Sequence, residues 1–98
     1  MRVGSEGLRF LSEFGVAAVM VNHAFNIGRR VEVEDDSGSK LTVVVKQVWG
    51  NSEETRGKLV GVSGFKTVEE WEQAVKKRNG GRLPRFIVVV EVVGSGSC

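Results

Sequence analysis

The feature that most constrains the fold is residues 86–93, FIVVVEVV, in which Glu91 is the only charged residue. A strand that alternates apolar and polar residues buries one face, whereas a strand that is apolar throughout needs cover on both faces. Pro84 lies just before this segment, where its missing N–H does least harm to a sheet. We therefore expect a central strand, and the rest of the chain must supply its neighbours and its cover.

The segment before this strand predicts a helix from Thr67 to about Arg78. Thr67 and Glu70 have the spacing of a capping box, and Asn79 with the two glycines after it ends the helix. The helix presents one apolar face, formed by Val68, Trp71 and Val75. Trp71 is therefore expected in the core.

The N-terminal half alternates apolar segments with turn residues. Its patterns predict a helix, a buried strand, a β-hairpin around a turn, a polar loop and a short strand or extended connection. These elements cover residues 5–14, 16–21, 30–49 with the turn at 35–39, 50–57 and 58–62, respectively. Two short helices and several strands in this order predict an α+β domain, most simply a small mixed β-barrel.

The composition is that of an ordinary globular domain, with 41% hydrophobic and 27% charged residues in 98. We expect one domain over residues 1–93 and a flexible tail, GSGSC, over 94–98. A single cysteine excludes an internal disulfide and, with a single histidine, argues against a zinc site, so no metal or cofactor is expected. The apolar runs are too short for a membrane span, and we expect a cytoplasmic protein.

Three segments, in this order, resemble the ASCH family, whose domains have a PUA-like β-barrel fold. They are IGRRVEVEDDSGSKLTVVVKQVW (27–49), SGFKTVEEWEQAVKK (63–77) and FIVVVEVV (86–93). The resemblance implies a PUA-like barrel. It also implies kinship with RNA-associated proteins and with small amidohydrolases that act on modified cytidine. ASCH domains often carry a Gly-x-Lys motif after the first helix; here Gly15 fits, but Ala17 stands at the lysine position. The hydrolase activity needs that lysine, so we do not carry it over and favour a non-enzymatic role.

A basic cluster spans the end of the second helix and the loop to the last strand: Lys76, Lys77, Arg78, Arg82 and Arg85. Cations of this kind bind phosphates and release counterions, which favours a nucleic-acid interface. The alternative is charge that complements the helix dipole and solvates the surface. Arg29 and Arg30 would strengthen the interface if the fold brought them to the same face.

A second set of candidates could line a cleft that holds an RNA base: Asn22, His23, Asn26 and Trp49. Asparagine and histidine side chains can hydrogen-bond a base, and an exposed tryptophan can stack on one. The alternatives are a loop histidine with local contacts and a tryptophan packed at the rim of the core. We therefore expect an RNA-binding module first. A protein-interaction module, with a possible homodimer through an edge strand such as 58–62, is the second hypothesis, and an amidohydrolase the third.

Overall fold

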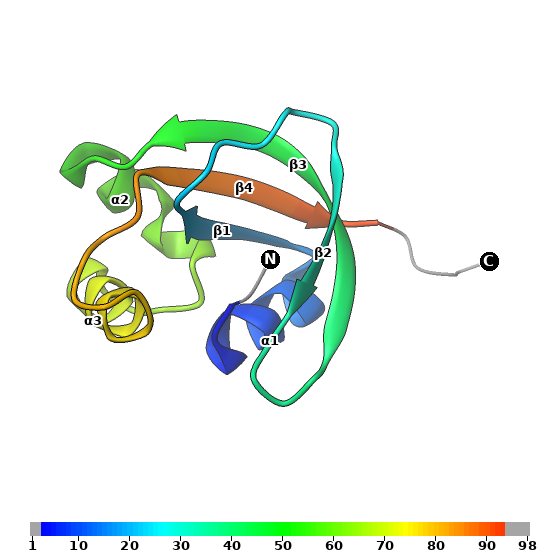
Figure 1. Cartoon of the computed structure of the whole chain (residues 1–98), viewed down its shortest axis with the longest axis horizontal. Coiled ribbons are helices and arrows are strands. Elements are labelled where there is room, and N and C mark those ends of the chain that lie inside the picture. Colours follow the sequence, from blue (N-terminus) through cyan, green and yellow to red (C-terminus); the bar gives the residue numbers. More distant parts are fainter. Residues whose placement is uncertain (1–2, 94–98) are drawn as a thin grey trace.

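The computed structural model describes residues 3–93, so the expected tail at 94–98 lies outside the described residues. Within them, β4 (Phe86–Val92) is a central strand of a four-stranded antiparallel sheet, as its all-apolar sequence predicts. It lies between β1 (Val16–Val21) and β3 (Lys40–Gly50), and β2 (Arg30–Glu34) follows β3, which gives the order β1-β4-β3-β2 (Figure 1).

The predicted hairpin is confirmed as β2 and β3. Its turn is held by Asp35, whose carboxylate accepts hydrogen bonds from the backbone N–H groups of Ser37 and Ser39 and from the Ser37 hydroxyl. Gly38 has a φ of 90°, a backbone conformation that glycine adopts without steric cost. Local turn chemistry therefore sets the register of this hairpin.

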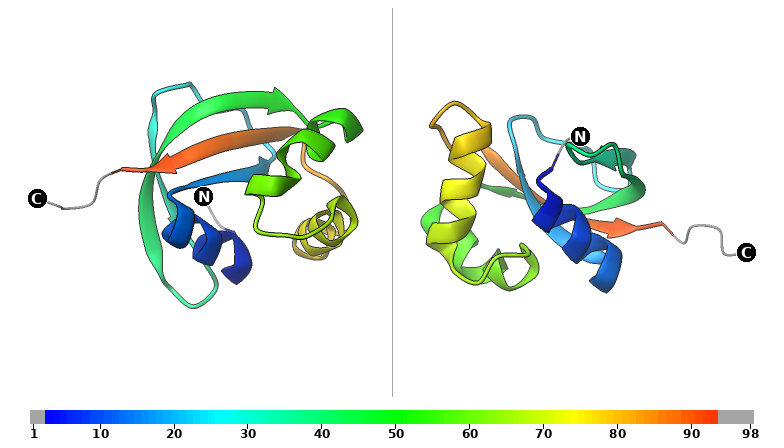
Figure 2. Two further views of the ribbon diagram at one scale, coloured as in Figure 1. Left: turned by 180° about the vertical axis from the view of Figure 1, so that it is seen from behind. Right: turned by 90° about the horizontal axis from the view of Figure 1, so that it is seen from below.

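Helices cover both faces of the sheet, as a doubly apolar β4 requires (Figure 2). The helix α1 (Ser5–Phe14) packs over one face, where Val88 and Val90 of β4 are fully buried. The helix α3 (Val68–Arg78) packs over the other face, where Ile87 and Val89 contact Trp71. Trp71 is only 2% exposed, which confirms its place in the core.

Two of the predicted helices are confirmed, and their ends follow the expected chemistry. Gly15 ends α1 with a φ of 79° and donates its N–H to the Leu11 carbonyl. Thr67 caps α3 by accepting the Glu70 N–H. The Glu70 carboxylate accepts the N–H of Lys66 rather than that of Thr67, so the return bond of the capping box is shifted by one residue.

The prediction for residues 50–62 is wrong. Residues 53–59 form a further helix, α2 (Glu53–Leu59), and 60–62 form the 3₁₀ helix η1 (Val60–Val62), so residues 51–62 contain no strand. Ser52 accepts the Thr55 N–H and starts α2. An edge strand at 58–62 is therefore not available for a homodimer.

The expected α+β class is confirmed, but closure into a barrel is not shown. Within residues 3–93 the strands β1 and β2 are the two edges of the sheet and do not pair with each other. The sheet curls instead, and β3 changes register between Val45 and Gln47, where a bulge increases its bend. Within the same residues, none of the helices has the length and apolar character that crossing a membrane requires.

Candidate functional site

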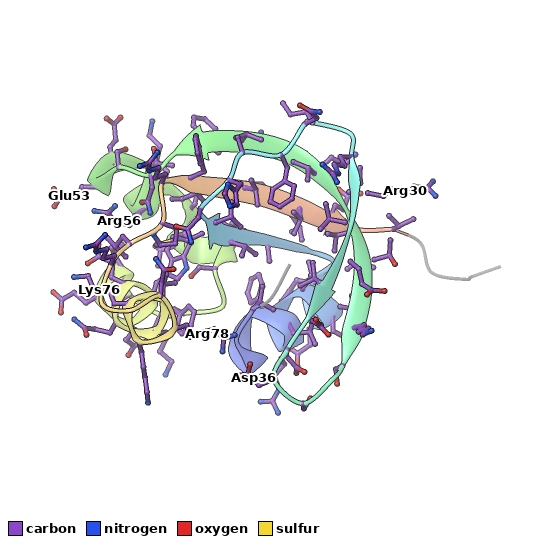
Figure 3. The ribbon with its side chains drawn as sticks, in the orientation of Figure 1. Arg30, Asp36, Glu53, Arg56, Lys76 and Arg78 are labelled. Atoms are coloured by element: carbon purple, nitrogen blue, oxygen red, sulfur yellow. The ribbon has the colours of Figure 1, made fainter. Side chains whose placement is uncertain are left out.

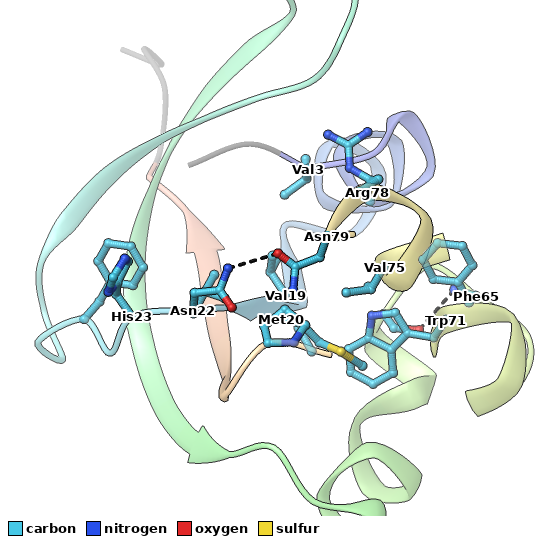
Figure 4. Close-up of a pocket in the computed structure, with 16 residues that line it drawn as sticks. Val3, Val19, Met20, Asn22, His23, Phe65, Trp71, Val75, Arg78 and Asn79 are labelled. Atoms are coloured by element: carbon cyan, nitrogen blue, oxygen red, sulfur yellow. Dashed lines mark hydrogen bonds between the residues drawn. The ribbon is translucent and has the colours of Figure 1, made fainter. Parts of the chain in front are cut away.

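A cleft of about 400 Å³ lies where the end of β1 meets the end of α3 (Figure 4). Its lining comes from four parts of the fold: the start of α1 with Val3, the second half of β1 with the loop after it, the side of α3 with Ser63 and Phe65, and Pro84 before β4. The two helices belong to different faces of the sheet, so the cleft follows the border between the two cores.

Most of the cleft wall is apolar. Met20 and Trp71 belong to one core cluster, and Figure 4 shows the Met20 side chain beside the Trp71 ring, with Val75 close to both. Val19 and Val3 belong to the other cluster and form the wall opposite. An apolar wall with a few polar groups at its edge is typical of sites that bind organic ligands.

Two asparagines join the walls at one end of the cleft. The Asn22 side-chain N–H donates to the Asn79 side-chain oxygen over 3.1 Å, and Asn79 in turn donates to the Arg82 carbonyl over 3.0 Å. The side-chain oxygen of Asn22 accepts no hydrogen bond from any described residue, so it remains available as an acceptor beside the cleft.

Arg78 lines the cleft, but its guanidinium charge is already neutralised by a partner within the protein. Its guanidinium group donates to both carboxylate oxygens of Asp36, over 2.7 and 3.3 Å. This bidentate pair connects the end of α3 to the turn between β2 and β3 (Figure 3). The geometry thus assigns Arg78 a structural role rather than a free phosphate-binding one.

His23 lies at the end of the cleft beyond Asn22 (Figure 4), and Phe25 also lines the cleft. The Arg29 guanidinium carbon is 5.9 Å from the centre of the Phe25 ring, within the range of a cation–π contact. His23 is exposed and hydrogen-bonds no hydroxyl or carboxylate among residues 3–93. The structure therefore brings Asn22, His23 and Arg78 of the predicted residues into one cleft.

The other predicted cleft residues lie outside its lining. Trp49 stands near the end of β3, is 40% exposed and donates its indole N–H to the Gln47 side chain over 3.1 Å. Asn26 is exposed in the loop between β1 and β2. Neither side chain contributes to the wall beside Trp71 and Val75.

The predicted basic residues separate into two groups. Lys76 and Lys77 belong to the last turn of α3, and Arg82 and Arg85 follow in the loop to β4. Arg30 lies at the opposite end of the molecule from Lys76 (Figure 3). A single surface therefore cannot hold Arg30 together with the α3 group.

Ala17, at the position where the ASCH resemblance would place a lysine, is a core residue. Ala17 is 1% exposed and packs with Val88 and Val90, and it does not line the cleft. Among residues 3–93, no three histidine, cysteine or acidic side chains gather as ligands of a metal ion would.

Sequence reasoning missed Asn79, which it interpreted only as the end of the helix, and the apolar wall formed by Met20, Trp71 and Val75. A residue that follows a helix and carries both a donor and an acceptor is a weak signal, because such residues are common at helix ends. The pairing of Asn79 with Asn22, 57 positions away, depends on the tertiary fold.

Comparisons of the chain with protein-family models, with curated proteins and with solved structures found no match.

Proposed function

We propose that this domain binds single-stranded RNA through the basic end of α3 and the loop after it, beside the cleft. One observation carries the proposal. Four cations, Lys76, Lys77, Arg82 and Arg85, form no ion pair with any described residue, whereas Arg56 and Arg78 nearby do. Cations that have no internal partner remain available to neutralise phosphates.

The position of these cations favours a nucleic acid over a simple solvating surface. Asn79 and Pro84, which line the cleft, belong to the same stretch of chain as Arg82 and Arg85. An RNA strand whose phosphates contact this basic segment would therefore pass the cleft, where one of its bases could contact Asn22 or His23. Sequence-specific recognition of RNA commonly uses unpaired bases of this kind.

The resemblance of residues 27–49, 63–77 and 86–93 to ASCH domains supports the same proposal, because relatives in that family include RNA-associated proteins. A PUA-like relationship of the curled sheet and a cytoplasmic location belong to this proposal too; the single cysteine agrees with a reducing compartment. No observation favours the amidohydrolase, since Ala17 stands where the lysine is needed.

The test is fluorescence anisotropy with a short single-stranded RNA at several salt concentrations. Replacing Lys76, Lys77, Arg82 and Arg85 by glutamine removes four phosphate contacts. With a slope of about −0.7 per contact for single strands, the dependence of log affinity on log salt should become shallower by about 3.

The control replaces Lys40 and Lys58 by glutamine. These lysines already pair with carboxylates, since their amines lie 3.6 and 3.2 Å from Glu32 and Glu54, respectively. This variant should bind RNA like the wild type. Equal affinity and equal salt dependence of the fourfold variant and the wild type would show that α3 is not the RNA-binding surface.

A further inference from the structure

The register of β1 against β4 shows which backbone groups of β1 form hydrogen bonds to β4. The Val92 N–H donates to the Gly15 carbonyl over 2.8 Å, so these two residues form a hydrogen-bonded pair. In an antiparallel ladder such pairs recur at every second residue. The register then places Ala17, Val19 and Val21 in hydrogen-bonded pairs with β4.

The β1 residues that alternate with Ala17, Val19 and Val21 direct their backbone N–H and C=O groups away from β4. The N–H and C=O groups of Ala18 and Met20 point away from β4, to the free edge of the sheet. No described residue hydrogen-bonds these backbone groups. Yet Ala18 is only 2% exposed and Met20 only 8%. Buried backbone groups without a partner are rare in folded proteins, because each lost hydrogen bond is costly.

This edge forms part of the cleft. Residues 18–21 all line it, and Figures 1 and 2 show α1 and α3 beyond the free edge of β1. The Ala18 and Met20 side chains face the α3 cluster with Trp71, whereas Val19 faces the α1 cluster with Val3. Both flanks of the edge are therefore apolar.

The other edge of the sheet differs. The Glu34 carbonyl of β2 accepts the Val3 N–H over 2.9 Å, so that edge is partly closed. Its outward backbone groups belong to the charged residues Arg30, Glu32 and Glu34, a common protection against strand pairing. The β1 edge, with Ala18 and Met20, lacks this protection.

We propose that the free edge of β1 binds an extended segment of a partner polypeptide, which enters the cleft as an additional strand. The spacing of the unpaired groups favours this occupant. Ala18 and Met20 present donor and acceptor pairs that repeat after two residues, about 7 Å, and a polypeptide strand matches both pairs at once. A nucleobase can match only one of these donor and acceptor pairs. This edge differs from the phosphate-binding surface of α3, but it shares the cleft in which the proposed function places a base.

The flanks predict the sequence of the segment. Residues opposite Ala18 and Met20 would direct their side chains to the cluster of Trp71 and Phe65, and the residue between them to Val3. Both directions lead to apolar walls, and the Asn22–Asn79 hydrogen bond marks one end of the cleft. The segment should therefore be short and carry apolar or β-branched side chains at successive positions.

The test uses the full chain and a defined probe, acetyl-Lys-Val-Thr-Val-Thr-Val-Lys-amide, with amide hydrogen exchange followed by NMR. The probe should slow exchange of the Ala18 and Met20 amides and leave the Ala17 and Val19 amides, already bonded to β4, unchanged. The same peptide with N-methylated valines keeps its side chains but loses donors, and should bind at least about tenfold more weakly.

Two variants separate the edge from its flank. Ala18→Pro removes an edge N–H that the ladder with β4 does not use, and should abolish binding of the probe. Val75→Trp narrows the cleft without altering β1 and should also abolish it, even if the proline variant fails to fold. Val68→Trp, on a residue of α3 outside the cleft, is the matched control and should bind normally.

Four results would overturn the proposal. If the N-methylated probe binds as tightly as the unmethylated one, backbone hydrogen bonds are not the basis of recognition. If neither probe binds, the edge does not bind a peptide of this kind. Protection of Ala18 and Met20 that rises with protein concentration, without probe, would identify a second copy of the chain as the occupant. Protection of the same amides by a short RNA would assign the edge to the nucleic acid instead.

Discussion

At the scale of single residues, Asp35 is the clearest case of a charge fixed by its surroundings. The Ser37 hydroxyl donates to its carboxylate over 2.7 Å and is the main reason that the pKa of Asp35 lies below its ordinary value of 3.8. Backbone N–H groups of Ser39, Ser37 and Gly38 act in the same direction, while burial opposes them. The folded protein therefore prefers the ionised form more strongly than the unfolded chain does.

The sign of the pH dependence follows from this preference. A lowered pKa in the folded state contributes stability that is present above pH 3.8 and is lost as the pH falls through the lower folded value. Asp35→Asn should therefore lower the free energy of unfolding at pH 7, and the difference from the wild type should shrink in strong acid. Urea unfolding at neutral pH and near pH 2 measures both values. A deficit that is equal at the two pH values would contradict the assignment, and Ser37→Ala should reproduce part of it.

Single residues also show how far the sequence could predict the candidate site. Asn22 and His23 follow a predicted strand, and the local pattern correctly placed them in a loop after it. Their cleft could not be predicted, because its other wall comes from Val75 and Asn79, more than fifty positions away. Apolar residues of a helix such as Val75 have the same local pattern whether they face a packed core or a cleft.

At the scale of elements, Arg56 ties α2 to α3 and to the end of β3. The Arg56 guanidinium donates to Glu72 of α3 and to the Asn51 side chain, each over 2.7 Å, and the pair with Glu72 is mostly shielded, at 14% and 22% side-chain exposure. The ion pair of Lys58 with Glu54 in the same helix is far more exposed, at 65% and 79%. These two pairs offer a matched comparison.

Arg56→Met should lower the free energy of unfolding by about 1–3 kcal/mol, because it leaves a partly buried carboxylate and an amide without their partner. Lys58→Met should change it by less than about 1 kcal/mol, since exposed ion pairs contribute little. Thermal or urea unfolding of both variants measures the difference. Equal effects would show that α2 is held to α3 by its apolar contacts instead.

The same helix explains what sequence reasoning missed among the elements. The polar run before residue 58 and Gly57 favour a loop, and the apolar residues after it favour a strand. The start signal was present in Ser52, which caps the helix, with Glu53 and Glu54 in its first turn. It was outweighed because α2 is short and depends on tertiary contacts such as Arg56–Glu72, which no local pattern contains.

At the scale of the whole molecule, the free edge of β1 is where the observed open sheet differs from a closed barrel. An open sheet leaves every second amide of β1 without a partner, whereas a closed barrel would give all of them partners. β4 differs from both edges, because its amides donate alternately to β1 and β3 and its side chains are buried on both faces. Because β4 pairs on both sides, as its sequence predicts, its amides serve as the reference against which the protection of the β1 amides is compared.

Hydrogen exchange of the free protein should therefore give an alternating pattern in β1. The amides of Ala17 and Val19 should be protected nearly as strongly as that of Val88, because all three belong to the same ladder. The amides of Ala18 and Met20 should exchange at least about tenfold faster, because no hydrogen bond must break first. Uniform protection along β1 would show instead that its outer edge is paired in solution, as closure into a barrel requires. The alternation is thus the measurement that separates a curled open sheet, with a free edge beside α3, from a PUA-like barrel.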